Sequence, residues 1–229
     1  MGAESEHMEA FAPDDPWMQL IEIHNHAKSV FLCAEEFDSS FRDFLQPILE
    51  LRHCLDHIIR VKAAERGING EVETKEPEYV KCSVDKAIGH VYRAFFDAAD
   101  WFSVCIRERI TKALKWYSHD CITAVIPNYY PELRPRVDRI CMEIAAIRGG
   151  KDIAKKNNLL PEVTEYRTAI DDLLKIHGQI QSCVPALVDW RWKNRWNAFI
   201  IWVVGAFLGG IAITVFTVWL LAKLGFAKP

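Results

Sequence analysis

One short stretch of the chain concentrates the side chains best suited to acid–base chemistry. The segment ELRHCLDHIIR, residues 50–60, contains Arg52, His53, Asp56 and His57. Residues four apart share a face of a helix, so Arg52 stacks above Asp56 and His53 above His57. Histidine can move protons near neutral pH, and arginine can stabilise developing negative charge. This density of polar groups in an otherwise apolar stretch marks the candidate site.

A second polar cluster follows in the segment GHVYRAFFDAAD, residues 89–100, and supplies His90, Arg93 and Asp97. If the two segments form an antiparallel helical hairpin, Arg52 faces Asp97 and Asp56 faces Arg93. Opposite charges then meet in a four-charge square. We expect Asp56, His90, Arg93 and Asp97 to form a polar network that supports the first cluster.

This network has two interpretations that the sequence leaves open. Buried arginines and aspartates require partners, because an unpaired charge is strongly disfavoured in a low-dielectric interior. The square can therefore be a structural salt-bridge network that specifies the fold. Alternatively, it can position catalytic or ligand-binding groups, and the two roles are compatible.

The first cluster resembles the R-x4-6-H signature of the HEPN superfamily, all-helical proteins many of whose members are RNA endonucleases. Arg52 and His57 match the ends of the signature, and His53 matches the polar residue that often follows the arginine. The resemblance implies a metal-independent reaction, usually at a dimer interface, in which the ribose 2′-hydroxyl attacks the adjacent phosphate. Arg52, His53 and His57 would be the catalytic residues. Membrane-attached HEPN-like proteins occur among bacterial antiviral systems. The resemblance therefore also implies a role in antiviral defence.

Hydrophobic spacing and helix-stop residues predict an all-α protein with long antiparallel helices. The predicted helices are Pro16 to Phe37, Ser39 or Ser40 to Arg66, Ser83 to about Ile126, Pro135 to Arg148, and Pro161 through Trp190. The polar segment 67–82 predicts an exposed loop.

The composition of the C-terminal part predicts a transmembrane helix. Residues Ala198 to Ala222 contain no ionisable side chain. At 1.5 Å per residue such a helix is about 37 Å long and can cross a hydrocarbon core of about 30 Å. Tryptophans flank the apolar run, where indole rings favour the headgroup layer. They are Trp190, Trp192, Trp196 and Trp219.

The flanking charges predict the orientation of this helix. Arg191, Lys193 and Arg195 precede it, whereas Lys223 and Lys228 follow it. The positive-inside rule then keeps the large N-terminal part in the cytoplasm, as in a tail-anchored protein of the bacterial inner membrane.

Small residues within the span predict a face for close helix packing. Gly205 and Gly209 form a GxxxG pair, and Gly210 extends the small-residue pattern. Such a face favours self-association in the bilayer, so we expect a homo-oligomer.

The overall composition excludes some classes of function. A net charge of −3 and a pI near 6.2 argue against general electrostatic binding of nucleic acid. A local basic face remains, which could meet RNA, anionic lipid or water. It comprises Arg134, Arg136, Arg139 and Arg148.

The seven cysteines lack CxxC spacing and predict reduced, mostly buried thiols. From these patterns we expect no metal site and no cofactor.

These features predict a disordered segment 1–15, a cytosolic helical domain 16–189, a juxtamembrane and transmembrane segment 190–225, and a short tail 226–229. Two functions are consistent with them. One is a membrane-anchored HEPN-like effector that cleaves RNA. The other is a non-enzymatic helical sensor or scaffold whose spans oligomerise to perturb or organise the membrane.

Overall fold

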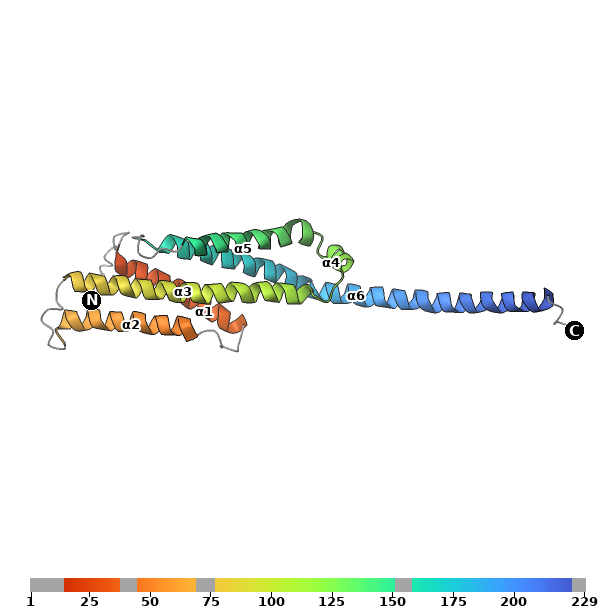
Figure 1. Ribbon diagram of the computed structural model, residues 1–229, viewed down its shortest axis with the longest axis horizontal. Helices are drawn as coiled ribbons and strands as arrows, with labels where there is room; N and C mark the ends of the chain where they lie inside the picture. Colours follow the sequence, from red (N-terminus) through yellow and green to blue (C-terminus); the bar gives the residue numbers. More distant parts are fainter. Residues whose placement is uncertain (1–14, 38–44, 69–76, 151–157, 224–229) are drawn as a thin grey trace, which may run out of the picture.

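The computed structural model confirms the all-α class for the part of the chain that it describes. The described residues are 15–37, 45–68, 77–150 and 158–223. The predicted disordered segment, apart from its last residue, and the predicted tail 226–229 lie outside these ranges. Within them the chain forms six α-helices and one short π-helix (Figure 1).

The first three helices pack side by side along the long axis of the bundle (Figure 1). They are α1 (Pro16–Phe37), α2 (Leu45–Arg66) and α3 (Pro77–Leu114). Helix α1 begins as predicted, since a carboxylate oxygen of Asp15 accepts a hydrogen bond from the Trp17 N–H at 2.9 Å. The Asp15 side chain thereby satisfies one of the free N–H groups of the first turn.

The predicted boundaries of the third helix are wrong at both ends. It starts at Pro77, so residues 77–82 are helical rather than part of an exposed loop, and proline is well suited to a first helical turn. It ends at Leu114 instead of continuing to Ile126. A separate helix, α4 (His119–Val125), follows because the Ser118 side chain caps it by accepting from the Cys121 N–H.

The last helices form the other side of the bundle. The π-helix η2 (Tyr129–Leu133) leads directly into α5 (Arg134–Gly149), which matches the predicted fourth helix closely. The final helix, α6 (Leu160–Lys223), is continuous over 64 residues, as predicted for a helix that runs on into the apolar segment.

Helix α3 is the centre of the core, because it packs against α1, α2 and α6. Its face toward α6 carries fully buried aromatic rings. The rings of Phe95 and Phe96 pack against each other and against Tyr166 of α6, with centroids 5.3–6.1 Å apart. The buried hydroxyls have acid partners: Tyr92 donates to Glu162 at 2.7 Å, and Tyr166 donates to Asp100 at 2.5 Å. Burial raises the pKa of Tyr92 to about 12, so its hydroxyl remains a donor.

Helix α6 changes character along its length. Its first part buries a stripe from Val163 to Leu187, with most members three or four residues apart. Pro185 lies inside the helix at the last buried turn, where it removes one backbone hydrogen bond. Every residue from 191 to 223 is exposed, and this part projects beyond the bundle (Figure 1). It is long and apolar enough to span a membrane.

The cysteine prediction is only partly correct. All seven cysteines are free thiols, but only Cys54 and Cys121 are buried, and Cys82 is exposed.

Half of the predicted basic face of α5 is paired with acids of other helices. Arg136 bonds Asp172 of α6 at 2.7 Å, and Arg148 bonds Asp100 of α3 at 3.2 Å. Two of its four arginines thus join helices. Hydrogen bonds from Arg136 and Lys175 lower the pKa of Asp172 from its ordinary value of 3.8.

We expect Arg136→Ala to lower the melting temperature at pH 7 by roughly 1–4 °C. The pair is partly exposed and contributes only about 0.5–1 kcal/mol. A carboxyl with a lowered folded-state pKa stabilises above its unfolded pKa, and this stabilisation is lost as the pH falls through the folded value. The difference between wild type and variant should therefore shrink below pH 3.8. Circular dichroism melts of the full chain in detergent measure this.

Arg139→Ala is the matched control, because Arg139 is an exposed arginine of the same helix. An Arg136→Ala defect that stayed constant down to acid pH would contradict the assigned role of the pair.

Candidate functional site

The face of α2 that meets α3 is defined by residues spaced three or four apart. Glu50, Cys54 and Val61 are buried, and His53 and His57 are half-buried. This spacing is that of a helix stripe packed on a neighbour. The polar members of the stripe therefore point into the bundle together with its apolar members.

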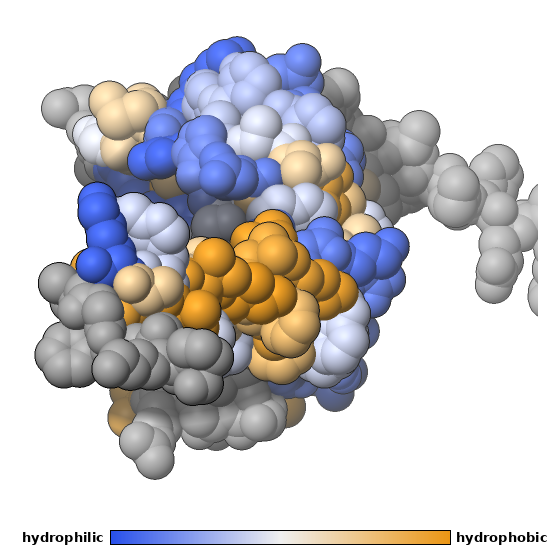
Figure 2. Space-filling view, turned by 90° about the vertical axis from the view of Figure 1, so that its right-hand side faces the viewer, coloured by the Kyte–Doolittle hydropathy of each residue, from blue (hydrophilic) through white to orange (hydrophobic). Residues whose placement is uncertain are grey.

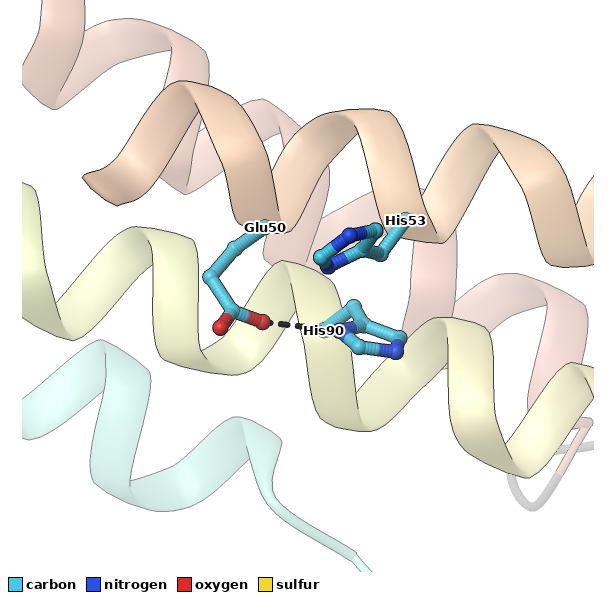
Figure 3. A group of neighbouring side chains, drawn as sticks. All are labelled: Glu50, His53 and His90. Atoms are coloured by element: carbon cyan, nitrogen blue, oxygen red, sulfur yellow. Dashed lines mark hydrogen bonds and ion pairs between the residues drawn. The ribbon is translucent and has the colours of Figure 1, made fainter. Parts of the chain in front are cut away.

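The centre of the candidate site is the carboxylate of Glu50, which is only 9% exposed. Its Oε2 lies 2.7 Å from Nδ1 of His90 and 2.9 Å from Nε of Arg93, both on α3. A guanidinium nitrogen of Arg93 also lies 2.8 Å from Nδ1 of His90. Figure 3 shows Glu50 and His53 extending from α2 toward His90 on α3.

The ionisation of Glu50 follows from these contacts. Burial alone raises the pKa of this carboxyl, but the hydrogen bonds and positive charge of His90 and Arg93 outweigh it and lower the pKa below the ordinary 4.5. Glu50 is thus a buried carboxylate whose charge depends on two partners from the next helix.

Three imidazole rings gather beside this carboxylate. The His90 ring lies 5.2 Å from that of His53 and 5.3 Å from that of His57, between centroids, and stacks on the latter. Nδ1 of His57 is buried and has no hydrogen-bond partner among the described residues. Burial lowers the pKa of His57, and the positive charges of His90, Arg60 and Lys86 lower it further. His57 is therefore neutral at pH 7.

The predicted catalytic residues lie on different faces of α2, although Arg52 still contacts His53. Arg52 is exposed, and one of its guanidinium nitrogens lies 3.3 Å from Nε2 of His53. His53 and His57 instead face α3. Arg52 lies two residues after Glu50, which places it about 200° around the helix from the buried face.

The predicted pairing of Asp56 with Arg93 is wrong. Asp56 is exposed on the outer side of α2, and Arg93 pairs with Glu50, six residues earlier. The two acids lie about 120° apart around α2, and only Glu50 faces α3. Asp97, predicted to face Arg52, lies half-buried on α3 one turn beyond Arg93.

Sequence reasoning missed Glu50, although a usable signal was present. Glu50, Cys54, His57, Val61 and Ala64 follow one another at steps of four and three residues. This pattern predicts a single buried stripe that includes the acid. Charge spacing alone, which grouped Arg52 with Asp56, selected the exposed face instead.

The donor set at this site suits a metal ion. One carboxylate oxygen of Glu50 and one ring nitrogen each of His53 and His90 all lie within 4.8 Å of one another. Cys54 is close in sequence, but burial raises the pKa of its thiol to about 11, which disfavours the thiolate. The imidazoles of the cluster can take up protons. Its arginines can bind an anion, and the lone pairs of Glu50, His53 and His90 can bind a cation.

Comparisons with protein-family models, curated proteins and solved structures found no match to this chain. Its function is therefore inferred from its own residues and their geometry.

We expect Glu50→Ala to destabilise the bundle by about 2 kcal/mol, because it leaves a half-buried imidazole and guanidinium without their acceptor. The melting temperature should fall by roughly 4–8 °C. Thermal melts of the full chain in detergent, with EDTA present, measure the effect.

Glu65→Ala is the matched control on the same helix, because Glu65 is exposed and makes only a surface pair with Lys62. Equal effects of the two substitutions would show that the Glu50 network contributes no more than a surface pair.

Proposed function

We propose that this chain is a single-pass, tail-anchored membrane protein that holds a helical effector or sensor domain at the cytoplasmic face of a membrane. The observation that carries this proposal is the exposed apolar part of α6. Large hydrophobic side chains from Phe199 to Leu221 point outward on all sides, with exposed fractions of 38–71%. Viewed from the end at which α6 projects, a hydrophobic patch occupies the centre, with hydrophilic side chains above it and to its right (Figure 2).

The polar groups within this segment favour lipid as its surroundings. The Thr214 and Thr217 hydroxyls donate to backbone carbonyls of Gly210 and Ile213, each at 2.8 Å. A continuous helix with internally bonded hydroxyls leaves few polar groups unsatisfied in hydrocarbon. A buried core helix would instead have its apolar side chains covered by the bundle.

The ends of the segment carry groups suited to the two interfaces. At the bundle end, Arg191 lies over the ring of Tyr117 at 5.3 Å, and Trp192 and Trp196 are exposed. At the far end, Lys223 lies over Trp219 at 4.9 Å. The excess of basic residues at the bundle end supports a cytoplasmic bundle.

The proposed homo-oligomer would form along the glycine face of the span. A Cβ atom added at Gly205, Gly209 or Gly210 would meet nothing within 4 Å, so the backbone is open to a close neighbour there. Small residues of this kind permit tight helix packing in membranes.

We expect the full chain to stay in the membrane pellet after alkaline carbonate extraction and to be released by detergent. The double variant Leu208→Arg and Ile211→Arg should lose this behaviour, because each charge near the centre of a span costs about 3 kcal/mol. Trypsin added outside spheroplasts should leave the bundle intact.

The matched control is Leu55→Arg with Ile59→Arg, which alters two exposed hydrophobic residues of the bundle. Carbonate release of the wild type, or equal retention of both double variants, would overturn the proposal.

A second candidate function, metal-independent RNA cleavage, is favoured by the protonation state of His57. A neutral, half-buried imidazole can accept the proton of the attacking 2′-hydroxyl. The exposed Arg52 is accessible to a phosphate and could stabilise the charge that develops on it. Its neighbour His53 completes the proposed catalytic set. In this proposal two subunits bring their pairs to one RNA.

We expect purified full-length protein in detergent with EDTA to cleave single-stranded RNA, and Arg52→Ala and His57→Ala each to lose about 100-fold or more in rate. Release of a dye from labelled RNA measures the rate.

Arg66→Ala, which changes a basic residue in the last turn of the same helix, should retain full activity. Folded wild-type protein that leaves RNA intact would remove the ribonuclease proposal and favour the non-enzymatic sensor or scaffold.

A further inference from the structure

We propose that Glu50, His53 and His90 form a binding site for a divalent first-row transition metal ion, with Zn²⁺ as the best match. One ligand atom from each residue lies within 4.8 Å of the other two. Two imidazoles and one carboxylate are a donor set that zinc uses with an open fourth position for water or substrate. The two elements that supply the ligands, α2 and α3, pack directly together.

Two ring nitrogens of the cluster lie beside guanidinium groups. Guanidinium groups only donate, so a ring nitrogen can accept from one only in the tautomer that leaves its lone pair free. Arg93 contacts Nδ1 of His90 at 2.8 Å, and Arg52 contacts Nε2 of His53 at 3.3 Å. The described cluster therefore has two positive side chains beside its nitrogen acceptors.

Nδ1 of His90 has two close neighbours that require different hydrogen-bonding roles of it. Nδ1 of His90 lies 2.7 Å from the Glu50 oxygen and 2.8 Å from the Arg93 nitrogen. A single ring nitrogen either donates to the carboxylate or accepts from the guanidinium, so one of these contacts opposes like atoms. A metal ion between the two atoms would use both lone pairs.

Binding would require only small movements at the surface of the cluster. Ligand atoms about 2.0–2.2 Å from a tetrahedral metal lie about 3.4 Å apart, so Glu50 and His90 would separate slightly. The Arg93 side chain is 41% exposed, and Arg52 is exposed, so both can turn toward solvent. The buried Nδ1 of His57 beside this point also lacks a partner among the described residues.

The choice of metal follows from the ligands. Imidazole nitrogen favours zinc, copper, iron and nickel over magnesium and calcium, which prefer all-oxygen sites. We therefore expect Zn²⁺ and Co²⁺ to bind, and Mg²⁺ and Ca²⁺ not to compete at similar concentrations.

The test uses the full chain in detergent, without a histidine tag, after treatment with EDTA and its removal. We expect one Zn²⁺ per chain in competition with a chromogenic chelator. Glu50→Gln, His53→Gln and His90→Gln should each weaken Zn²⁺ affinity by about 100-fold or more. Co²⁺ should give the visible absorption of a four-coordinate site in the wild type and not in these three variants.

His119→Gln is the matched control, because that histidine stacks on Tyr130 away from the cluster and should leave affinity unchanged. Arg93→Gln should bind Zn²⁺ at least as tightly as wild type, because it removes a competing cation. Circular dichroism establishes that each variant is folded, and His53→Gln, at a half-buried position, serves if Glu50→Gln unfolds.

Absence of saturable Zn²⁺ binding, or equal affinity in the three cluster variants and the control, would overturn the proposal. Loss of affinity in Arg93→Gln would contradict the displacement of that arginine. Membrane insertion and RNA cleavage do not enter this measurement, so the metal site stands or fails independently of the functions proposed above.

Discussion

The structure depends on one helix that meets two kinds of surroundings. In its first part, α6 buries one stripe of side chains against the bundle and leaves the rest polar. Beyond residue 190 all its side chains are exposed, and most are apolar. A helix satisfies its own backbone hydrogen bonds, so it is the element that can pass from a water-facing bundle into lipid without unpaired polar groups. In the proposed function, α6 therefore sets the position of the bundle relative to the membrane.

A second constraint acts between α2 and α3, where a carboxylate is buried. Glu50 remains charged because His90 and Arg93 reach it from the neighbouring helix. An apolar residue could stabilise the same position equally well or better, since burying charges costs desolvation energy. The buried Glu50 is therefore consistent with two roles. It can specify how α2 and α3 pair, or it can belong to a ligand-binding site.

Helix α3 brings these two parts of the molecule together. One of its faces carries His90 and Arg93 toward α2, and another carries Tyr92 toward Glu162 of α6. The polar layer and the aromatic layer thus share one rigid element. A ligand held by Glu50 of α2 and His90 of α3 would thus contact the helix that also packs against α6.

Local patterns in the sequence were sufficient for most of the fold. The helical class, the start of α1, the extent of α5 and the continuity of α6 follow from capping residues, proline positions and hydrophobic spacing. The division between α3 and α4 was missed, because it depends on the hydroxyl of Ser118 and on a change of direction that periodicity does not record.

The sequence indicated the two segments that form the polar cluster but paired their charges incorrectly. Residue spacing identified the histidines of α2 and the His90–Arg93 pair of α3. It did not identify their acid, because the charged residues Arg52 and Asp56 lie on the outer face of α2.

The amino-acid sequence by itself determined that the chain is helical and that its last long segment is apolar on every side, since both are local properties of side-chain type and order. Only the tertiary structure decided which acid faces the histidines. That choice depends on the rotation and register of α2 against α3, which the packing of buried side chains from both helices sets.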